Sequence, residues 1–191
     1  MTEQTRVIDR RAALTAGVAT LSTAGVLAVL GMAAPGRALA AAPAQDVQLL
    51  NAAIALEHEG IAAYQIAAES GLLTPDVLKI GVTFQGHHKQ HRDELMAAVT
   101  RLGGKPVPAK ALAAYAADLG AASLKDQTGV LRLALKLERG AANAYLGLIP
   151  SLEQTEFHLL AARMAGDEAF HAATLGNALG DAIPQKALMF G

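Results

Sequence analysis

Hydrophobic residues recur every three or four positions along most of the chain after residue 45, which is the period of a helix that faces a core. In the first such stretch, Leu50, Ile54, Ile61 and Ala68 fall on one face. Four long stretches share this pattern. We expect helices at about 46–70, 75–103, 127–149 and 155–179, the last beginning between residues 151 and 155.

Residues that favour helix ends separate these stretches. The expected N-caps are Asp46, Thr74 and Asp126. Short turns after Gly71 and Pro150 make antiparallel hairpins of the first two and the last two helices. The longer link at 103–126, with room for a short helix at 109–119, permits a crossover. The expected fold class is all-α, a four-helix bundle with a long crossover between its second and third helices. The tail, 180–191, should pack on the bundle or on a neighbouring chain.

Composition and charge exclude several function classes. Ala and Leu dominate and aromatic residues make up 4% of the chain, with no Trp, which favours helices over sandwiches and barrels. Because there is no Cys, disulfides, thiolate metal sites and iron–sulfur clusters are excluded. The formal net charge is −1 without a basic block, so the electrostatic footprint of a nucleic-acid-binding protein is missing.

The first forty residues have the features of an export signal. Arg10 and Arg11 precede an apolar stretch at 12–34, and residues 38–40 (Ala-Leu-Ala) have the small-residue pattern of a cleavage site. An arginine pair before the apolar run resembles a twin-arginine signal. We expect export to the periplasm or extracellular space, with no membrane span after cleavage; an uncleaved N-terminal anchor is the alternative. The expected domains are a signal at 1–40 and the bundle at 41–191.

Two of the predicted helices carry a Glu on an otherwise apolar face. Glu57 is followed seven residues later by Tyr64, and Glu138 is followed seven residues later by Tyr145. Seven residues is about two helical turns, so each Glu shares a stripe with its Tyr. We expect each Tyr to hydrogen-bond a carboxylate across the bundle, with simple core packing as the alternative.

The other two helices carry pairs of polar residues three positions apart, His88 with His91 and Glu168 with His171. Residues at this spacing point to one side of a helix. The spacing between the helices of a hairpin repeats, because 31 residues separate the first Glu from His88 and 30 separate the second Glu from Glu168. At 1.5 Å per residue, the candidates of the first hairpin both lie about 20 Å from their turn, so they should meet at one height.

Three carboxylates and three imidazoles that converge in one core call for a cation. A buried carboxylate is costly unless it is paired, protonated or bound to metal. Oxygen and nitrogen ligands on four facing helices suit two divalent transition-metal ions with open positions for water, dioxygen or peroxide. The alternative is a metal-free bundle whose polar core residues pair with one another.

With these motifs, residues 46–178 resemble the ferritin-like di-metal carboxylate superfamily, in which two helices supply one Glu each and two supply Glu-x-x-His. The export signal makes the chain most similar to secreted ferritin-like proteins, some of them called desiccation-related. The resemblance implies metal ligands at Glu57, His91, Glu138, Glu168 and His171. His88 stands where the family has Glu. This change could shift metal preference toward Zn, Cu or Mn, leave one ion weakly held or reduce oxidase activity.

Four further polar residues lie near these motifs. His58, Glu59 and His87 are one or two positions off the inner stripe and are not expected to be ligands, although His58 and His87 are candidates for an accessory role. His158 is expected to be a surface or helix-start residue.

The expected function is that of an exported protein that binds two metal ions, Fe first, with Mn, Zn or Cu as alternatives. Its partners would be the metal ions and dioxygen or peroxide, in oxidase, ferroxidase or peroxide-removing chemistry. A non-catalytic envelope protein that buffers metal or protects against stress is the alternative, so enzymatic activity is left open. A storage cage is a third possibility and would require a homo-oligomer.

Overall fold

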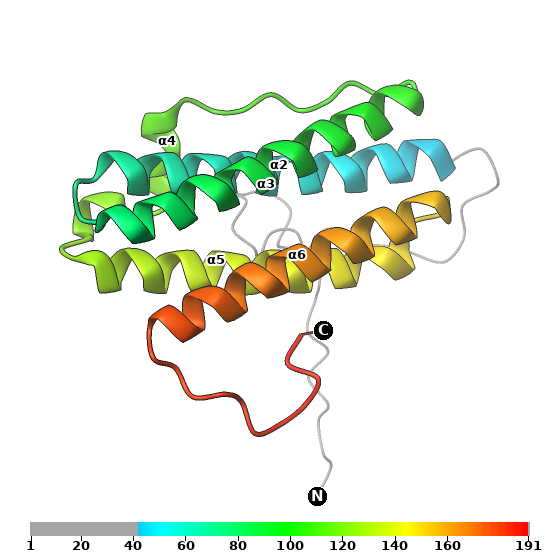
Figure 1. The fold of residues 1–191 in the computed structure, drawn as a ribbon. Helices are drawn as coiled ribbons and strands as arrows, with labels where there is room; N and C mark the ends of the chain where they lie inside the picture. Colours follow the sequence, from blue (N-terminus) through cyan, green and yellow to red (C-terminus); the bar gives the residue numbers. More distant parts are fainter. Residues whose placement is uncertain (1–41, 191) are drawn as a thin grey trace, which may run out of the picture.

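The computed structural model describes residues 42–190, and within that range the secondary structure is helical without strands. Helix α2 (Ala42–Glu69) and helix α3 (Pro75–Arg101) form one antiparallel hairpin, and α5 (Gln127–Leu148) and α6 (Glu156–Ala178) form the second (Figure 1). The all-α four-helix prediction is confirmed. The predicted export signal at 1–40 lies outside the described residues. Across 42–190, none of the helices combines the length and the apolar character that crossing a membrane requires.

The connection between the two hairpins runs along the bundle. After α3 the chain returns to the opposite end of the molecule and forms α4 (Leu112–Asp118), which packs against α2, and a short 3-10 turn, η1 (Ala121–Ser123), before α5 begins (Figure 1). Because the chain comes back before α5 starts, α5 runs parallel to α3 and antiparallel to α6. This is the predicted long crossover. Its helix is shorter than the predicted 109–119 because the backbone is still extended at Ala111.

Most helix ends follow local sequence signals. Asp126 caps α5 as predicted, and its side chain accepts the N–H of Gly129 at 2.7 Å. Gly71 follows α2 with a φ of 69°, a left-handed conformation that glycine adopts without strain. Thr74 holds the N-cap position of α3, but its side chain makes no cap hydrogen bond. Its backbone N–H donates instead to the side chain of Gln127 at 2.8 Å, which ties the two hairpins together.

Asp46 differs from its predicted role. Helix α2 begins four residues earlier, and Asp46 lies inside the helix with no exposed surface. Its carboxylate accepts the backbone N–H groups of Glu153 at 2.9 Å and Gln154 at 3.0 Å. The prediction that Asp46 caps its own helix is therefore wrong, because this carboxylate satisfies donors just before α6, 107 residues away.

Two apolar clusters make up most of the described core and are separated by a polar layer, and a small third cluster pairs Leu56 with Ala144. The larger cluster surrounds Ile54, Leu95, Tyr145 and Phe157. The smaller contains Phe84, Leu131, Leu135, Ala172 and Leu175. Phe190 of the C-terminal tail packs against the smaller cluster, which agrees with a tail packed on the bundle. On each of the four long helices, the buried Glu and His residues fall between the two clusters.

Candidate metal centre

Six polar side chains from the four long helices meet in the layer between the apolar clusters. All of them are buried, with at most 7% of any residue exposed. They are Glu57 of α2, His88 and His91 of α3, Glu138 of α5, and Glu168 and His171 of α6. We call them the six-residue cluster. Their meeting is what the matching heights in the two hairpins predicted.

His88 lies in the middle of the cluster and contacts all three carboxylates. Its Nδ1 is 2.7 Å from Glu57 Oε2 and 3.6 Å from Glu168 Oε1, and its Nε2 is 3.3 Å from Glu138 Oε1. Burial by itself lowers the pKa of His88, but the charges of Glu168 and Glu57 and the hydrogen bonds to the carboxylates outweigh it. The pKa of His88 is therefore well above its usual range, and without metal the ring carries a positive charge.

Each of the other two imidazoles joins two carboxylates of the cluster. His91 Nδ1 lies 3.0 Å from Glu168 Oε1 and 3.5 Å from Glu57 Oε1. His171 Nδ1 lies 3.2 Å from Glu168 Oε2 and 3.4 Å from Glu138 Oε2. Burial opposes protonation of both rings, but these contacts raise the pKa of His91 to about 10 and also raise that of His171.

The three carboxylates differ in their proton affinity. Burial would raise the pKa of Glu57, but the charges and hydrogen bonds of His88 and His91 bring it down to about 2. The pKa of Glu138 is also lowered well below its usual value, since hydrogen bonds from Glu168, His171 and His88 outweigh burial. Burial prevails at Glu168 and raises its pKa to about 7. Of the three, Glu168 is therefore the one that shares a proton at neutral pH.

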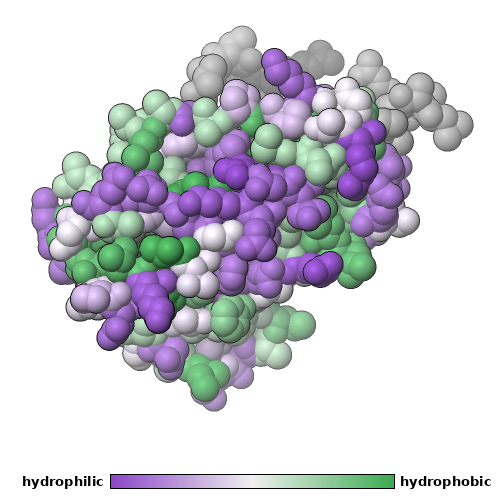
Figure 2. Space-filling model, turned by 45° about the horizontal axis from the view of Figure 1, so that its top comes forward, coloured by the Kyte–Doolittle hydropathy of each residue, from purple (hydrophilic) through white to green (hydrophobic). Residues whose placement is uncertain are grey.

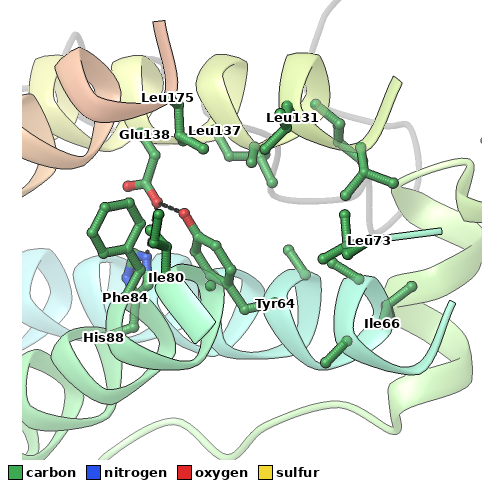
Figure 3. Close-up of a pocket in the computed structure, with 18 of the residues that line it drawn as sticks. Tyr64, Ile66, Leu73, Ile80, Phe84, His88, Leu131, Leu137, Glu138 and Leu175 are labelled. Atoms are coloured by element: carbon green, nitrogen blue, oxygen red, sulfur yellow. Dashed lines mark hydrogen bonds and ion pairs between the residues drawn. The ribbon is translucent and has the colours of Figure 1, made fainter. Parts of the chain in front are cut away.

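Two tyrosines connect the hairpins through the cluster. Tyr64 of α2 donates its hydroxyl hydrogen to Glu138 of α5, and Tyr145 of α5 donates to Glu57 of α2 (Figure 3 shows the first pair). Burial and the neighbouring carboxylates raise the pKa of both phenols well above 10, so both stay protonated donors. The reciprocal exchange places both tyrosines where the seven-residue spacing predicted.

The cluster contains two overlapping groups that could hold a metal ion. One consists of Glu57, His88, His91 and Glu168, and the other of His88, Glu138, Glu168 and His171. In each group, one ligand atom from every residue lies within 4.8 Å of the others. This buried set of nitrogen and oxygen donors fits divalent transition metals. His88 and Glu168 belong to both groups.

The polar groups of the cluster also satisfy one another's hydrogen bonds without a metal ion. Across residues 42–190, every buried side-chain nitrogen or oxygen atom has a hydrogen-bond partner. Protons on the imidazoles provide positive charge among the carboxylates, which is the charge that a metal ion would otherwise supply. Metal binding would therefore replace protons in a preformed cage.

Comparison with known proteins bears on this arrangement. Residues 45–181 match the family model described as the ferritin-like domain. The chain belongs to the ferritin-like family. Among solved structures, this ferritin-like chain is similar to the crystal structure of a conserved hypothetical protein from Mycobacterium tuberculosis, at 23% identity and a TM-score of 0.64. The match covers 76% of this chain and 97% of the other, and it supports the fold alone. No curated protein matches the chain.

Three polar residues near the motifs lie outside the cluster of this ferritin-like protein, as predicted. The ring of His58 is 3.2 Å from the carbonyl of Val107 in the crossover. Burial raises the pKa of Glu59, which interacts with the charge of Lys110 and not with the cluster. His158 makes a 3.0 Å hydrogen bond to the carbonyl of Leu152 just before α6, in keeping with a helix-start role.

Three further side chains contact the cluster, and Asp167 extends it to the surface. His87 Nδ1 lies 2.9 Å from His171 Nε2, and the Phe84 ring stacks on His171 at a centroid distance of 4.0 Å. Asp167 Oδ2 lies 3.1 Å from His91 Nε2 with 60% of its side chain exposed. Sequence reasoning missed Asp167, because its position beside Glu168 suggested the solvent face of α6.

Proposed function

We propose that this ferritin-like protein binds two transition-metal ions in the six-residue cluster, iron first and manganese next, and acts on dioxygen or peroxide outside the cytoplasm. The observation that carries the proposal is the pair of overlapping four-residue groups in one buried layer. Burial of three carboxylates and three imidazoles costs free energy, and bound metal ions would offset that cost by neutralising the carboxylates.

The proposed ligand roles follow from the two groups. Glu57 and His91 would hold one ion, Glu138 and His171 would hold the other, and Glu168 would reach both. Two redox-active ions held in this way would supply one electron each to dioxygen or peroxide. The apolar clusters on either side would limit water to the open positions.

The two tyrosines would position the carboxylates. Neither phenol ionises, because its raised pKa keeps the hydroxyl protonated. Tyr145 holds one oxygen of Glu57 and Tyr64 holds one oxygen of Glu138, so the remaining oxygens are directed into the cluster. Groups that orient ligands in this way typically change metal affinity by about 10–100-fold when they are removed.

His88 would make the protein bind the two ions with different affinities. Both of its nitrogens contact carboxylates, and without metal it provides positive charge at the centre of the cluster. A neutral imidazole there offers one nitrogen ligand, whereas a carboxylate offers two oxygens and a negative charge. We therefore propose that one of the two ions is held more weakly than the other.

Reversible metal buffering in the envelope, or stress protection without turnover, is the second candidate function. It is favoured by the complete hydrogen bonding of the cluster, since metal could leave without exposing unpaired buried groups across residues 42–190. Turnover separates the two. The catalytic proposal expects a metal-loaded sample to consume dioxygen or peroxide repeatedly and a Glu168→Gln sample to do so far more slowly. Binding without turnover supports buffering.

Export is proposed from residues 1–40 alone and has its own test. Expression of the full chain in a host with a twin-arginine system should give a secreted product whose N-terminus is Ala41. Replacing Arg10 and Arg11 by Lys should leave the protein in the cytoplasm. Secretion that is unaffected by this replacement would contradict the twin-arginine route.

A further inference from the structure

An elongated cavity lies beside the six-residue cluster. Its volume is about 80 Å³, several times the roughly 10–15 Å³ that one water molecule needs. Its lining extends from Leu56 to Ala68 on α2 and from Val130 to Ala141 on α5. At 1.5 Å per residue these spans are about 16–18 Å long. A small volume spread over such a length describes a narrow bore along the bundle.

The two ends of the cavity differ in chemistry. Tyr64, His88 and Glu138 line one end, where the cavity meets one of the two candidate metal groups. Figure 3 shows these polar atoms gathered together, while Leu73 and Leu131 lie further along the bundle. Leu73 and Val77, near the turn between α2 and α3, line the other end, and hydrophobic side chains are among those exposed on that side of the molecule (left in Figures 1 and 2). The bore therefore leads from an apolar end of the bundle to the cluster.

Small residues create this space. A side chain on Gly60 would bring its Cβ within 2.9 Å of the His88 ring, and one on Gly81 would place it 3.5 Å from the Tyr64 ring. Gly60 is therefore required to make room for the His88 ring, whereas a Cβ at Gly81 would make only an ordinary contact with Tyr64. Ala67 and Ala134 line the bore farther from the cluster. Leucine or phenylalanine at those alanines would fill it.

The lining indicates what the cavity could bind. Most of it is aliphatic, and its acidic members are Glu59 and Glu138. Among the residues that line it there is no Lys or Arg to pair with an anionic head group, and the positive charge of His88 is already paired with three carboxylates. Apolar cavities of this kind stay dry and take up apolar molecules. A narrow bore favours an unbranched chain over a ring system, and the acidic members disfavour a carboxylate.

We propose that this cavity binds a neutral, unbranched aliphatic molecule with one end beside Tyr64, His88 and Glu138. The inference names a substrate class for the same centre and so rests on the proposed function. Its physical basis is the burial of methylene groups against the aliphatic lining. The polar end places the last atoms of the chain next to the Glu138 group of the candidate metal centre.

The test compares 1-octanol with octanoate, which share a chain length and differ in charge. Isothermal titration calorimetry on the full chain without metal should show one octanol per chain and at least tenfold weaker binding of octanoate; metal is left out because octanoate could bind to the cation itself. The octanol titration is then repeated on the full chain loaded with cobalt(II). Octanol should also change the visible spectrum of the bound cobalt, because the chain would end at the cluster. Metal content is measured on the same samples.

Matched variants locate the binding. Ala134→Phe fills the bore and should weaken octanol binding at least tenfold, with Ala67→Leu as a milder filling variant should the first fail to fold. Ala173→Phe makes the same change on the exposed side of α6, outside the lining, and should leave binding unchanged. Circular dichroism and metal content confirm that each variant is folded and loaded.

The outcomes separate this inference from the proposed function. Metal-loaded protein that binds no octanol, or that keeps its octanol affinity when the bore is filled, overturns the inference and leaves the metal proposal standing. Equal binding of octanoate overturns the neutral substrate class. A chain that binds octanol but takes up no metal contradicts the proposed function, since the cavity would then serve a different purpose.

Discussion

Tyr145→Phe tests the link between the bundle and its metal chemistry at a single atom. Tyr145 is 1% exposed, and its hydroxyl donates to Glu57, a proposed metal ligand on the other hairpin. The substitution keeps the ring that packs in the larger apolar cluster and removes only the donor. It leaves one oxygen of a buried carboxylate with a weaker contact, the 3.5 Å approach of His91 Nδ1.

The expected size of the effect follows from these contacts. A hydrogen bond to a charged group contributes about 1.5–3 kcal/mol to stability. In a domain of this size, each kcal/mol lowers Tm by roughly 2–4 °C, so the metal-free variant should melt about 3–12 °C lower. Loss of a group that orients a ligand should also weaken metal binding by about 10–100-fold.

Tyr115→Phe is the matched control. Tyr115 is also buried, but its hydroxyl accepts the backbone N–H of Lys110 at 3.2 Å, away from the cluster. Loss of this neutral hydrogen bond should cost about 0.5–1.5 kcal/mol and should not change metal affinity. Differential scanning calorimetry gives Tm and a competition titration with a chelating dye gives affinity. Equal metal affinity in Tyr145→Phe and wild type would show that the hydroxyl does not position a ligand.

Four further predictions address the cluster and the fold. Glu168→Gln removes the one carboxylate common to both groups and should lower the metal content, measured by mass spectrometry, to less than half that of wild type; an unchanged content excludes its bridging position. His88→Glu should raise metal uptake at limiting metal, and reduced uptake would contradict the view that His88 weakens one ion. Burial lowers the pKa of His91, but its carboxylate partners raise it to about 10, so the folded ring keeps its proton up to that pH. Because metal binding must displace this proton, metal affinity should increase as the pH rises toward 10, and a weakly buffered titration should show proton release. Metal affinity that does not depend on pH would count against His91 as a ligand. Asp46→Ala leaves two backbone N–H groups before α6 without their acceptor. The free energy of unfolding, measured in urea, should fall by about 2–4 kcal/mol, and Asp46→Asn should recover part of this loss. An unchanged free energy of unfolding would mean that water replaces the carboxylate.

The fold could be predicted from the sequence because its elements are specified locally. Asp126 caps α5 through Gly129, three residues away, and Gly71 follows α2 in a left-handed conformation. Asp46 could not be placed in the same way. An acidic residue near a helix start resembles an N-cap in sequence, whereas here its partners lie 107 and 108 residues away and depend on how the hairpins pack.

The membership of the cluster followed from spacing, but its internal contacts did not. Matching heights brought the six residues together, and the seven-residue Glu–Tyr spacing placed both phenols. The contact of His88 with three carboxylates depends on the rotation of α3 within the bundle, which a sequence pattern leaves open. Asp167 was missed because it directly precedes Glu168 and has a largely exposed side chain on α6. The cavity reflects the combined effect of small residues on several helices, which no single stretch of sequence contains.

The most direct test is elemental analysis of the protein purified after export from a host with a twin-arginine system, with Glu168→Gln prepared in parallel. The metal proposal predicts close to two transition-metal ions per wild-type chain, matching the two groups, and a clear loss in the variant. Wild-type protein that is folded but free of transition metal, even after anaerobic incubation with iron(II) or manganese(II), would contradict it, and the six residues would then form a self-paired polar layer in a helical scaffold.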